Sequence, residues 1–462
     1  MNLKANPSTE DLQRIDAAHH LHPFTDYKAL NEEGTRIIVK ADGIWLWDSD
    51  GNRILDGMAG LWLVQVGYGR TSIADAAHRQ MLELPYYNTF FKTTHPPAIA
   101  LSEKLAELTP DHLNHVFFCN SGSEANDTVF RMVRHYWQSM GKPQNRKIIG
   151  RTYGYHGSTV AASALGGMGA MHEQGGMVPD VHHIMPPYWF GYGMDMDKDA
   201  FGIKAAQALA EKIDELGEDS VGAFIAEPIQ GAGGVLIPPE TYWPEVKKVL
   251  AERDILLVAD EVICGFGRTG KWFGSQYYDL EPDLMPIAKG LSSGYLPIGG
   301  VMVSDRVAEG LINDGGEFYH GYTYSGHPAS CAAALENLRI MVDETIIETA
   351  EAEIIPYFNE RWRALGEHPL VGEARALGLL GAIELVPNKA DLSQRFDPVG
   401  QVGTLCRDIS VRNGLVMRGV RDGMVISPPL VITREEVDTL VQRAARALDE
   451  TYDTLKKEGR VA

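Results

Sequence analysis

Two patterns of apolar residues alternate along most of this chain. Short unbroken apolar runs, most clearly Val221–Ala226, Ile255–Ala259 and Leu284–Ala288, predict strands that are buried on both faces of a parallel sheet. Between such runs apolar residues recur every three or four positions, as in residues 201–216, which predicts a helix. This alternation extends from about residue 65 to residue 330 and predicts an α/β fold with a mostly parallel sheet.

The two ends of the chain follow other patterns. Residues 44–57, IWLWDSDGNRILDG, place two apolar runs around a turn sequence and predict a β-hairpin. Near the C-terminus, residues 379–385 and 424–426 predict strands, and residues 433–457 predict a capped final helix. The Gly- and Met-rich residues 166–176 show neither period and are predicted to form a loop.

Ionisable residues follow two of the apolar runs directly. Asp260 and Glu261 come after one run, and Lys289 comes after the next. In open α/β sheets, ligands bind outside the carboxyl ends of the strands, so these groups are expected at one edge of the sheet. An amine and an acid in one pocket suit pyridoxal phosphate, whose Schiff-base lysine works with a carboxylate that keeps the pyridine nitrogen protonated.

The segments around these residues carry a specific resemblance. DEVICGFGRTG (residues 260–270) and KGLSSGYLPIGG (residues 289–300) resemble the signature of class III aminotransferases of fold type I. The resemblance covers nearly the whole chain. It implies a large domain with a mostly parallel seven-stranded sheet flanked by helices, and a smaller α+β domain built from both termini. We therefore expect boundaries at 1–64, 65–330 and 331–462.

A strand followed by a capped helix forms a candidate anion site. Residues 116–119 are apolar, and Ser121 and Glu124 have the spacing of a capping box, so a helix should begin at Ser121. Free backbone N–H groups at such a start attract a phosphate. The segment NSGSEAND also matches the phosphate-binding turn of the family, although a capped helix after a strand is usually only structural.

The resemblance implies the remaining cofactor contacts and the catalytic pair. Lys289 would carry the cofactor and Asp260 would hold its ring nitrogen, while Tyr155 would stack on the ring beside His156. Thr323 would reach the phosphate of a neighbouring subunit's cofactor, which implies a homodimer with shared sites and leaves pairing into a tetramer open. The implied cofactor-binding residues are Ser121, Gly122, Ser123, Tyr155, His156, Glu227, Asp260, Val262, Lys289, Tyr322 and Thr323.

Aromatic residues and one arginine are the candidates for substrate binding. Taken alone, each aromatic residue is at least as often part of a core as part of a pocket. By resemblance the arginine holds an α-carboxylate in a bidentate pair; Arg418 is the choice, with Arg421 close enough to be confused with it. The predicted substrate-binding residues are Trp62, Phe90, Phe91, Tyr153, Ala232 and Arg418.

The expected activity is transfer of an amino group from a primary amine or ω-amino acid to pyruvate. The sequence does not distinguish among putrescine, β-alanine, taurine and arylalkylamines as the amino donor. The alternatives within the fold are an ornithine- or 4-aminobutyrate-type enzyme that uses 2-oxoglutarate, an aminomutase and a dialkylglycine decarboxylase. A non-catalytic sensor of pyridoxal phosphate is disfavoured, because such a protein needs a fused basic DNA-binding domain.

Another reading of the signature segment is a P-loop. GFGRTGK (residues 265–271) matches the start of that motif, but Trp272 stands where a Ser or Thr should bind magnesium. The glycine loop also follows the acidic strand, whereas in a P-loop protein it comes first. A P-loop ATPase is therefore rejected.

Composition narrows the partners and the compartment. The net charge of −20 argues against nucleic acid and anionic membrane as partners. Four widely spaced cysteines, no signal-peptide pattern and no long apolar run lead us to expect a cytoplasmic protein. His182 and His183 lack further spaced ligands, so no metal site is expected.

Overall fold

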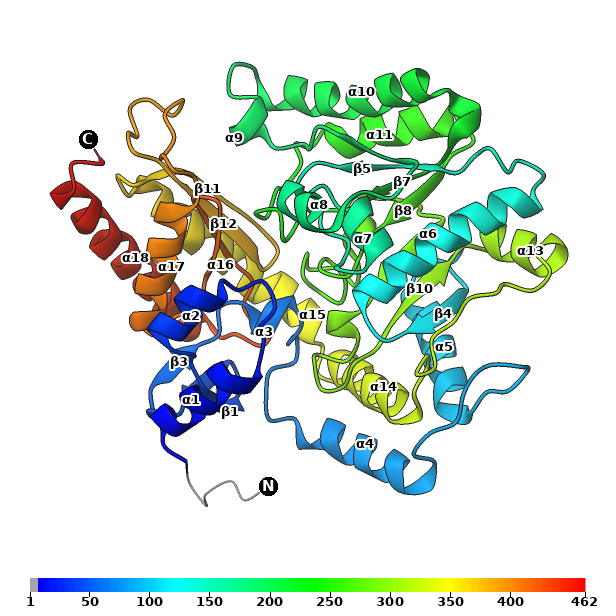
Figure 1. Cartoon of the computed structure of the whole chain (residues 1–462), viewed down its shortest axis with the longest axis horizontal. Coiled ribbons are helices and arrows are strands. Elements are labelled where there is room, and N and C mark those ends of the chain that lie inside the picture. Colours follow the sequence, from blue (N-terminus) through cyan, green and yellow to red (C-terminus); the bar gives the residue numbers. More distant parts are fainter. Residues whose placement is uncertain (1–6, 462) are drawn as a thin grey trace.

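A computed structural model describes residues 7–461 of the chain and contains a central seven-stranded sheet (Figure 1). The strands lie in the order β4-β10-β9-β8-β7-β5-β6. β10 runs antiparallel to both of its neighbours, and the other pairs are parallel. The predicted mostly parallel seven-stranded sheet is therefore confirmed. Its strands are β4 (His115–Cys119), β5 (Lys147–Arg151), β6 (Val181–Ile184), β7 (Val221–Ala226), β8 (Leu256–Ala259), β9 (Leu284–Ile287) and β10 (Gly299–Val303).

Helices bury both faces of this sheet. Successive residues of a strand point to opposite faces, so Ile148 packs in one apolar cluster and Ile149 in another. On one side lies α6 (Gly122–Ser139), and on the other lie α10 (Lys198–Leu216) and α11 (Tyr242–Ala251). Burial on both faces is the reason why the strands are continuous apolar runs rather than alternating ones.

The two ends of the chain come together beside the large sheet. The predicted N-terminal hairpin is present and belongs to a three-stranded sheet, and Leu55 forms a bridge to Leu415 near the other end of the chain. Figure 1 shows the first and last helices lying on the same side of the molecule. The small-domain strands are β1 (Ile38–Asp42), β2 (Trp45–Asp48), β3 (Arg53–Leu55), β11 (Val371–Leu377), β12 (Leu380–Leu385), β13 (Arg418–Val420) and β14 (Gly423–Ile426).

The C-terminal strands form an antiparallel sheet in the order β11-β12-β14-β13. The predicted final helix is α18 (Arg434–Lys457), and Thr433 and Glu436 form its capping box. The C-terminal α+β arrangement is therefore confirmed. The domain boundaries at residues 64 and 330 stay a prediction, and residues 1–6 of the first segment lie outside the described part.

The prediction of a loop over residues 166–176 is wrong in part. Gly169–Gly175 forms helix α8, and Nε2 of His172 on it donates to the carbonyl oxygens of Ser163 and Gly166. This anchoring by tertiary contacts outweighs the low helix propensity of the glycines. Within residues 7–461 no helix is both long and apolar enough to cross a membrane.

The remaining helices connect the strands or cover the two smaller sheets. They are α1 (Thr9–His19), α2 (Tyr27–Glu33), α3 (Ala59–Trp62), α4 (Thr71–Glu83), α5 (Pro96–Leu108), α7 (Val160–Leu165), α9 (Trp189–Tyr192), α12 (Gly274–Tyr277), α13 (Asp305–Asp314), α14 (Pro328–Asp343), α15 (Ile346–Thr349), α16 (Ile355–Arg363) and α17 (Gln401–Arg412).

Candidate active site

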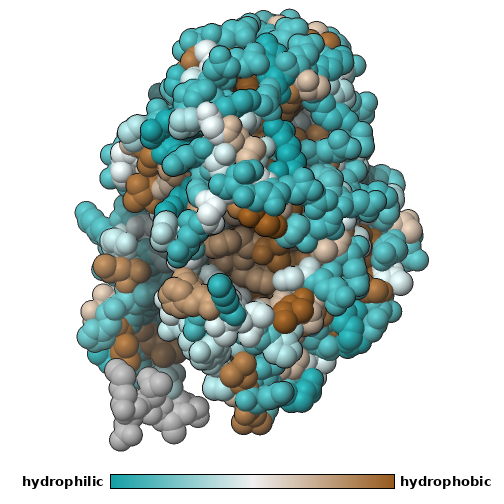
Figure 2. All heavy atoms as spheres, turned by 90° about the vertical axis from the view of Figure 1, so that its right-hand side faces the viewer, coloured by the Kyte–Doolittle hydropathy of each residue, from teal (hydrophilic) through white to brown (hydrophobic). Residues whose placement is uncertain are grey.

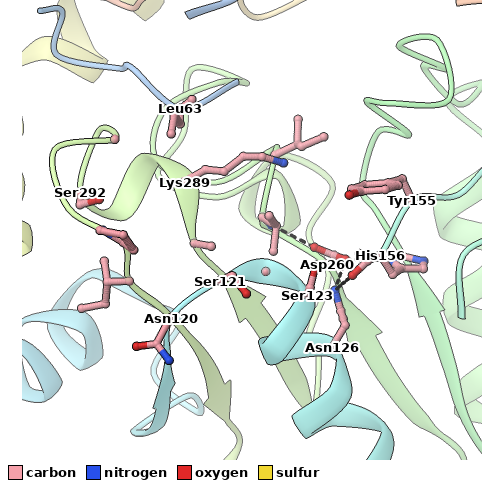
Figure 3. Close-up of a pocket in the computed structure, with 18 of the residues that line it drawn as sticks. Leu63, Asn120, Ser121, Ser123, Asn126, Tyr155, His156, Asp260, Lys289 and Ser292 are labelled. Atoms are coloured by element: carbon pink, nitrogen blue, oxygen red, sulfur yellow. Dashed lines mark hydrogen bonds and ion pairs between the residues drawn. The ribbon is translucent and has the colours of Figure 1, made fainter. Parts of the chain in front are cut away.

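A cavity of about 350 Å³ lies where β7, β8 and β9 end and α6 begins. This is the carboxyl edge of adjacent parallel strands, where the apolar runs were expected to deliver their ionisable groups. Nine of the predicted site residues line it, together with residues that the sequence did not single out (Figure 3). The nine are Ser121, Gly122, Ser123, Tyr155, His156, Glu227, Asp260, Val262 and Lys289.

Three donors hold the carboxylate of Asp260. Asn126 donates from Nδ2 to Oδ2 over 2.8 Å, and Nδ1 of His156 lies 2.6 Å from the same oxygen. The backbone N–H of Val262 donates to the other oxygen over 3.0 Å. The side chain is buried, and these bonds fix its direction.

Lys289 approaches the cavity from the second position after β9. Its backbone has φ of +42°, a left-handed conformation that is strained for a residue with a side chain. Figure 3 shows the side chain extending across the cavity toward the side where Tyr155 stands. Burial lowers the pKa of the amine to about 8, partly opposed by the charges of Asp260 and Glu227. A substantial fraction of the amine is therefore neutral and nucleophilic near neutral pH.

The start of α6 forms a cradle for an anion. The hydroxyl of Ser121 caps the helix by accepting from the N–H of Glu124 over 3.2 Å. A Cβ on Gly122 would come within 2.7 Å of Cγ1 of Val262, and one on Gly157 within 2.6 Å of Oγ of Ser123. Only glycine at these two positions lets backbone and ligand approach closely. The helix dipole favours a phosphate at this place.

Glu227 supports the wall that carries Tyr155. Its carboxylate accepts from the N–H of Tyr155 over 3.1 Å and from the N–H of Gly231 over 2.8 Å. Burial raises the pKa of this carboxyl group above its ordinary value. The Tyr155 hydroxyl lies 3.1 Å from Oγ of Ser158, and its ring borders the cavity. Glu227 therefore fixes the position of the predicted stacking ring.

Some predicted substrate residues lie behind the cavity wall. Trp62 and Ala232 are buried in an apolar cluster that includes Ile263, and Ile263 itself lines the cavity. The indole Nε1 of Trp62 has no hydrogen-bond partner among the described residues. Tyr153 accepts a hydrogen bond from the hydroxyl of Tyr192, also outside the lining of the cavity.

The two candidate arginines differ in their contacts. Arg421 donates to the carbonyl oxygen of Gly233 over 3.0 Å and lies 4.3 Å from the ring centre of Tyr153. No hydrogen bond or ion pair joins the Arg418 side chain to another described residue, and burial lowers the pKa of its guanidinium. Its charge acts on both Lys289 and Tyr155, so it lies close to the cavity. Arg418 is thus the arginine that is free to take an anionic ligand.

The other predicted residues lie around a second hollow. Phe90 and Phe91 line a cavity of about 460 Å³, and the Phe91 side chain is 89% exposed. Tyr322 donates to the carbonyl oxygen of Glu124 over 3.0 Å, and Thr323 is exposed. Within this chain none of the four reaches the lining of the first cavity.

Asn126 is the main residue that the sequence did not single out. It donates to Asp260 and also to the carbonyl oxygen of His156 over 2.8 Å. The sequence feature that could have pointed to Asn126 is its position: it is a polar residue one turn after Gly122, on the buried face of α6. Asn120 and Ser292 also line the cavity; both lie in the segments that resemble the family, but neither was named as a site residue.

A seven-stranded, mostly parallel sheet with a buried lysine, a fixed aspartate and an anion cradle at its carboxyl edge is the arrangement of a pyridoxal phosphate enzyme of fold type I. Comparison with known proteins agrees with this class. The family model for "Aminotransferase class-III" matches residues 27–448. The chain therefore belongs to the class III aminotransferases, enzymes that depend on pyridoxal phosphate.

Characterised relatives resemble the chain over nearly its full length. It is 60% identical over 447 residues to a putrescine–pyruvate aminotransferase of Pseudomonas aeruginosa, covering 96% of this chain and 97% of that protein. A thermostable (S)-enantioselective ω-transaminase from Thermomicrobium roseum superposes with a TM-score of 0.93 at 42% identity, covering 96% and 99% of the two chains. The ω-transaminase of Pseudomonas jessenii, solved with PMP, gives 0.94 at 39% identity, covering 96% and 99%.

The residues of the first cavity fit pyridoxal phosphate. A Cβ at Gly122 would press on Val262 and one at Gly157 would press on Ser123, so glycine at both positions leaves these two cavity-lining residues in place. Asp260 offers a carboxylate for the pyridine nitrogen, and Lys289 offers an amine of lowered pKa for the aldehyde. One cavity therefore contains partners for the phosphate, the ring nitrogen and the aldehyde of the cofactor.

Proposed function

We propose that this enzyme transfers an amino group from putrescine, or a related aliphatic diamine, to pyruvate. The observation that carries this proposal is the 60% identity to the putrescine–pyruvate aminotransferase of P. aeruginosa over 96% of the chain. At such identity the pocket of the relative is expected to be largely retained. Lys289 and Asp260, placed in one cavity, supply the groups that the chemistry needs.

The bound cofactor supplies a positively charged ring that stabilises negative charge on the carbon next to the amino nitrogen. Asp260 would hold the proton on the ring nitrogen with a carboxylate that is oriented by Asn126, His156 and the N–H of Val262. The Nζ of Lys289 would act as the base that removes the proton from the substrate carbon. Burial makes this amine a suitable base, since its pKa of about 8 lies near working pH.

Other residues position the reactants. The start of α6, with Ser121, Gly122 and Ser123, binds the phosphate, and Tyr155 supports the ring. Arg418 binds the carboxylate of pyruvate and leaves that position when an amine without a carboxylate enters. Its lack of a described partner supports this role, because a guanidinium already paired with an acid would have to break that pair first.

The two half-reactions test this proposal separately. Cofactor-loaded enzyme is mixed with putrescine, and the absorption band of the bound cofactor is followed; pyruvate is then added and alanine is quantified. We expect loss of the band with putrescine, its return with pyruvate, and neither change in Lys289→Ala. Return of the band with 2-oxoglutarate but not with pyruvate would contradict the proposed acceptor. No reaction with putrescine alongside reaction with β-alanine or taurine would contradict the donor.

We also propose that the enzyme acts as a homodimer in the cytoplasm. Phe91, Tyr319 and Tyr324 are exposed by 89%, 77% and 61%, which is unusual for large aromatic side chains. Phe90 and Phe91 line the second hollow together with Glu317, Phe318, His320 and Gly321. Figure 2 shows apolar residues gathered around a hollow on the face that is turned to the right in Figure 1. Four buried free cysteines support a reducing compartment.

In this dimer, Tyr322 and Thr323 of one subunit would complete the phosphate site of the other. Light scattering on the purified protein measures the mass, and Thr323→Val measures the contribution to cofactor binding. We expect twice the chain mass of 50.8 kDa, or four times if dimers pair. The Thr323→Val enzyme should bind the cofactor more weakly at unchanged mass. A monomer that turns over substrate at the full rate would contradict shared sites.

A further inference from the structure

The N-terminal segment holds a cluster of metal-binding side chains that the reaction does not use. Asp16 lies on α1, His20 caps the end of that helix, and His22 follows in the next turn. One ligand atom from each of the three lies within 4.8 Å of the others. Nδ1 of His20 is 3.1 Å from Oδ1 of Asp16, and Nε2 of His22 is 2.8 Å from Oδ2. The two imidazole rings are 4.1 Å apart between centres.

We propose that Asp16, His20 and His22 form a binding site for one Zn²⁺ ion. Two imidazole nitrogens and one carboxylate oxygen, with a water in the fourth position, are a common zinc ligand set. Bonds of about 2.0–2.1 Å in a tetrahedral arrangement place ligand atoms about 3.3 Å apart. The 3.1 Å between Oδ1 of Asp16 and Nδ1 of His20 needs to open by only a few tenths of an ångström, whereas Nε2 of His22, now 2.8 Å from Oδ2, has to turn toward the metal on the Oδ1 side. Imidazoles disfavour Ca²⁺ and Mg²⁺, which prefer oxygen ligands.

A second contact orients the carboxylate for this role. The hydroxyl of Thr35 donates to Oδ2 of Asp16 over 2.5 Å, and Thr35 itself is held through its carbonyl oxygen by Gln13. Oδ1 is then the oxygen that is left to face the metal, beside Nδ1 of His20. Hydrogen bonds from outside the ligand set commonly fix the direction of a metal-binding carboxylate. The cluster is also accessible, since the His20 side chain is 60% exposed.

The position of the cluster gives the metal a consequence for the active site. Two residues after His22, Phe24 lies with its ring edge toward the ring of Tyr155, 6.4 Å between centres. Phe24 is 73% exposed and has φ of +51°, so few contacts within this chain hold the segment there. A Zn²⁺ ion that joins the end of α1 to His22 would fasten this segment beside the cavity.

Calorimetric titration of the untagged, cofactor-loaded enzyme with ZnCl₂, after chelator treatment and removal of free cofactor, tests the site. We expect one Zn²⁺ per chain in the wild type and at least a tenfold weaker affinity in Asp16→Asn, His20→Gln and His22→Gln. Thr35→Val should weaken binding by about 10- to 100-fold, as loss of a carboxylate-orienting bond does elsewhere. His19→Gln is the matched control, because His19 is exposed and adjacent to His20 but outside the cluster.

Two further measurements separate a metal site from a set of hydrogen bonds. Co²⁺ in place of Zn²⁺ should give the strong visible absorption of four-coordinate cobalt, lost in His22→Gln and retained in His19→Gln. Hydrogen exchange over residues 16–35 should slow when Zn²⁺ is added to the wild type and stay unchanged in Asp16→Asn. No saturable binding to the wild type, or equal binding to the Asp16→Asn and His22→Gln enzymes, would overturn the proposal.

Discussion

Substituting Gly122 by alanine tests whether the start of α6 forms the cofactor's phosphate site. The new Cβ would lie 2.7 Å from Cγ1 and 3.1 Å from Cγ2 of Val262. Ordinary contact between carbon atoms is about 3.5–4.0 Å, so one of the groups has to move by about 0.8 Å. Val262 lines the cavity, and the free direction for its methyl groups is therefore the space that the cofactor occupies.

The magnitude follows from the cost of overpacking. Inserting a methyl group into a closely packed site costs about 1–3 kcal/mol, which corresponds to about a 5- to 150-fold weaker affinity if the cost falls on the bound state. In the cofactor-free protein the cavity can accept the displaced side chain. We therefore expect the melting temperature of the cofactor-free enzyme to change little, and the stabilisation by the cofactor to shrink.

A double-mutant cycle isolates this contact. Cofactor-free enzyme is titrated with pyridoxamine phosphate, whose amine cannot bond to Lys289, so that the measured affinity reports non-covalent binding. Val262→Ala removes both methyl groups, and in that background Gly122→Ala should cost less than twofold. Equal loss in both backgrounds would refute the proposed clash. Unchanged affinity in the Gly122→Ala single variant would refute the placement of the phosphate.

Three further predictions concern the residues around Lys289. The rate of cofactor capture by the cofactor-free enzyme should rise with pH and level off near pH 8, because the neutral amine of Lys289 is the nucleophile and burial lowers its pKa from 10.5 to about 8. Stopped-flow absorbance measures this rate, and a rise that continues to pH 10 would contradict the effect of burial. Asn126→Leu removes one donor to Asp260 and should weaken cofactor binding by about 5- to 150-fold, measured by the same titration, whereas full affinity would show that Asn126 is dispensable. Arg418→Leu should raise KM for pyruvate by about 10- to 150-fold and leave the half-reaction with putrescine within a fewfold, and an equal effect on both substrates would contradict the assigned role.

The sequence predicted the parts of the site that depend on local patterns. Apolar runs that end in Glu227, Asp260 and Lys289 become adjacent parallel strands, and adjacent parallel strands place their ends at one edge. The capped helix after Ser121 could be predicted for the same reason, since its capping residue and its apolar face lie in one continuous segment of the sequence. For these residues the resemblance to the family and the physical pattern point to the same positions.

Residues whose role depends on distant contacts could not be predicted in this way. In the sequence, Asn126 begins a glycosylation sequon, Asn126-Asp127-Thr128. Only the fold shows that its side chain donates to the carboxylate of Asp260, 134 positions away. Trp62 was expected in the pocket, but in this chain it packs behind Ile263 with φ of +70°. A tryptophan among small residues is found both in protein cores and in pocket walls, so this sequence pattern does not distinguish the two.

The zinc site and the active site differ in how the chain fixes their geometry. Lys289 and Asp260 are positioned by strands that are buried on both faces, where close packing fixes their directions. Asp16, His20 and His22 are positioned by one helix end and by Thr35; the His20 side chain is 60% exposed, and those of Asp16 and His22 are 15% and 20% exposed. A bound ion would then add constraint where packing supplies little, beside Phe24, whose ring lies against Tyr155. Because Tyr155 lines the cavity, metal content should affect KM for the amine more than kcat, and steady-state kinetics with and without Zn²⁺ in the wild type and Asp16→Asn distinguish the two effects.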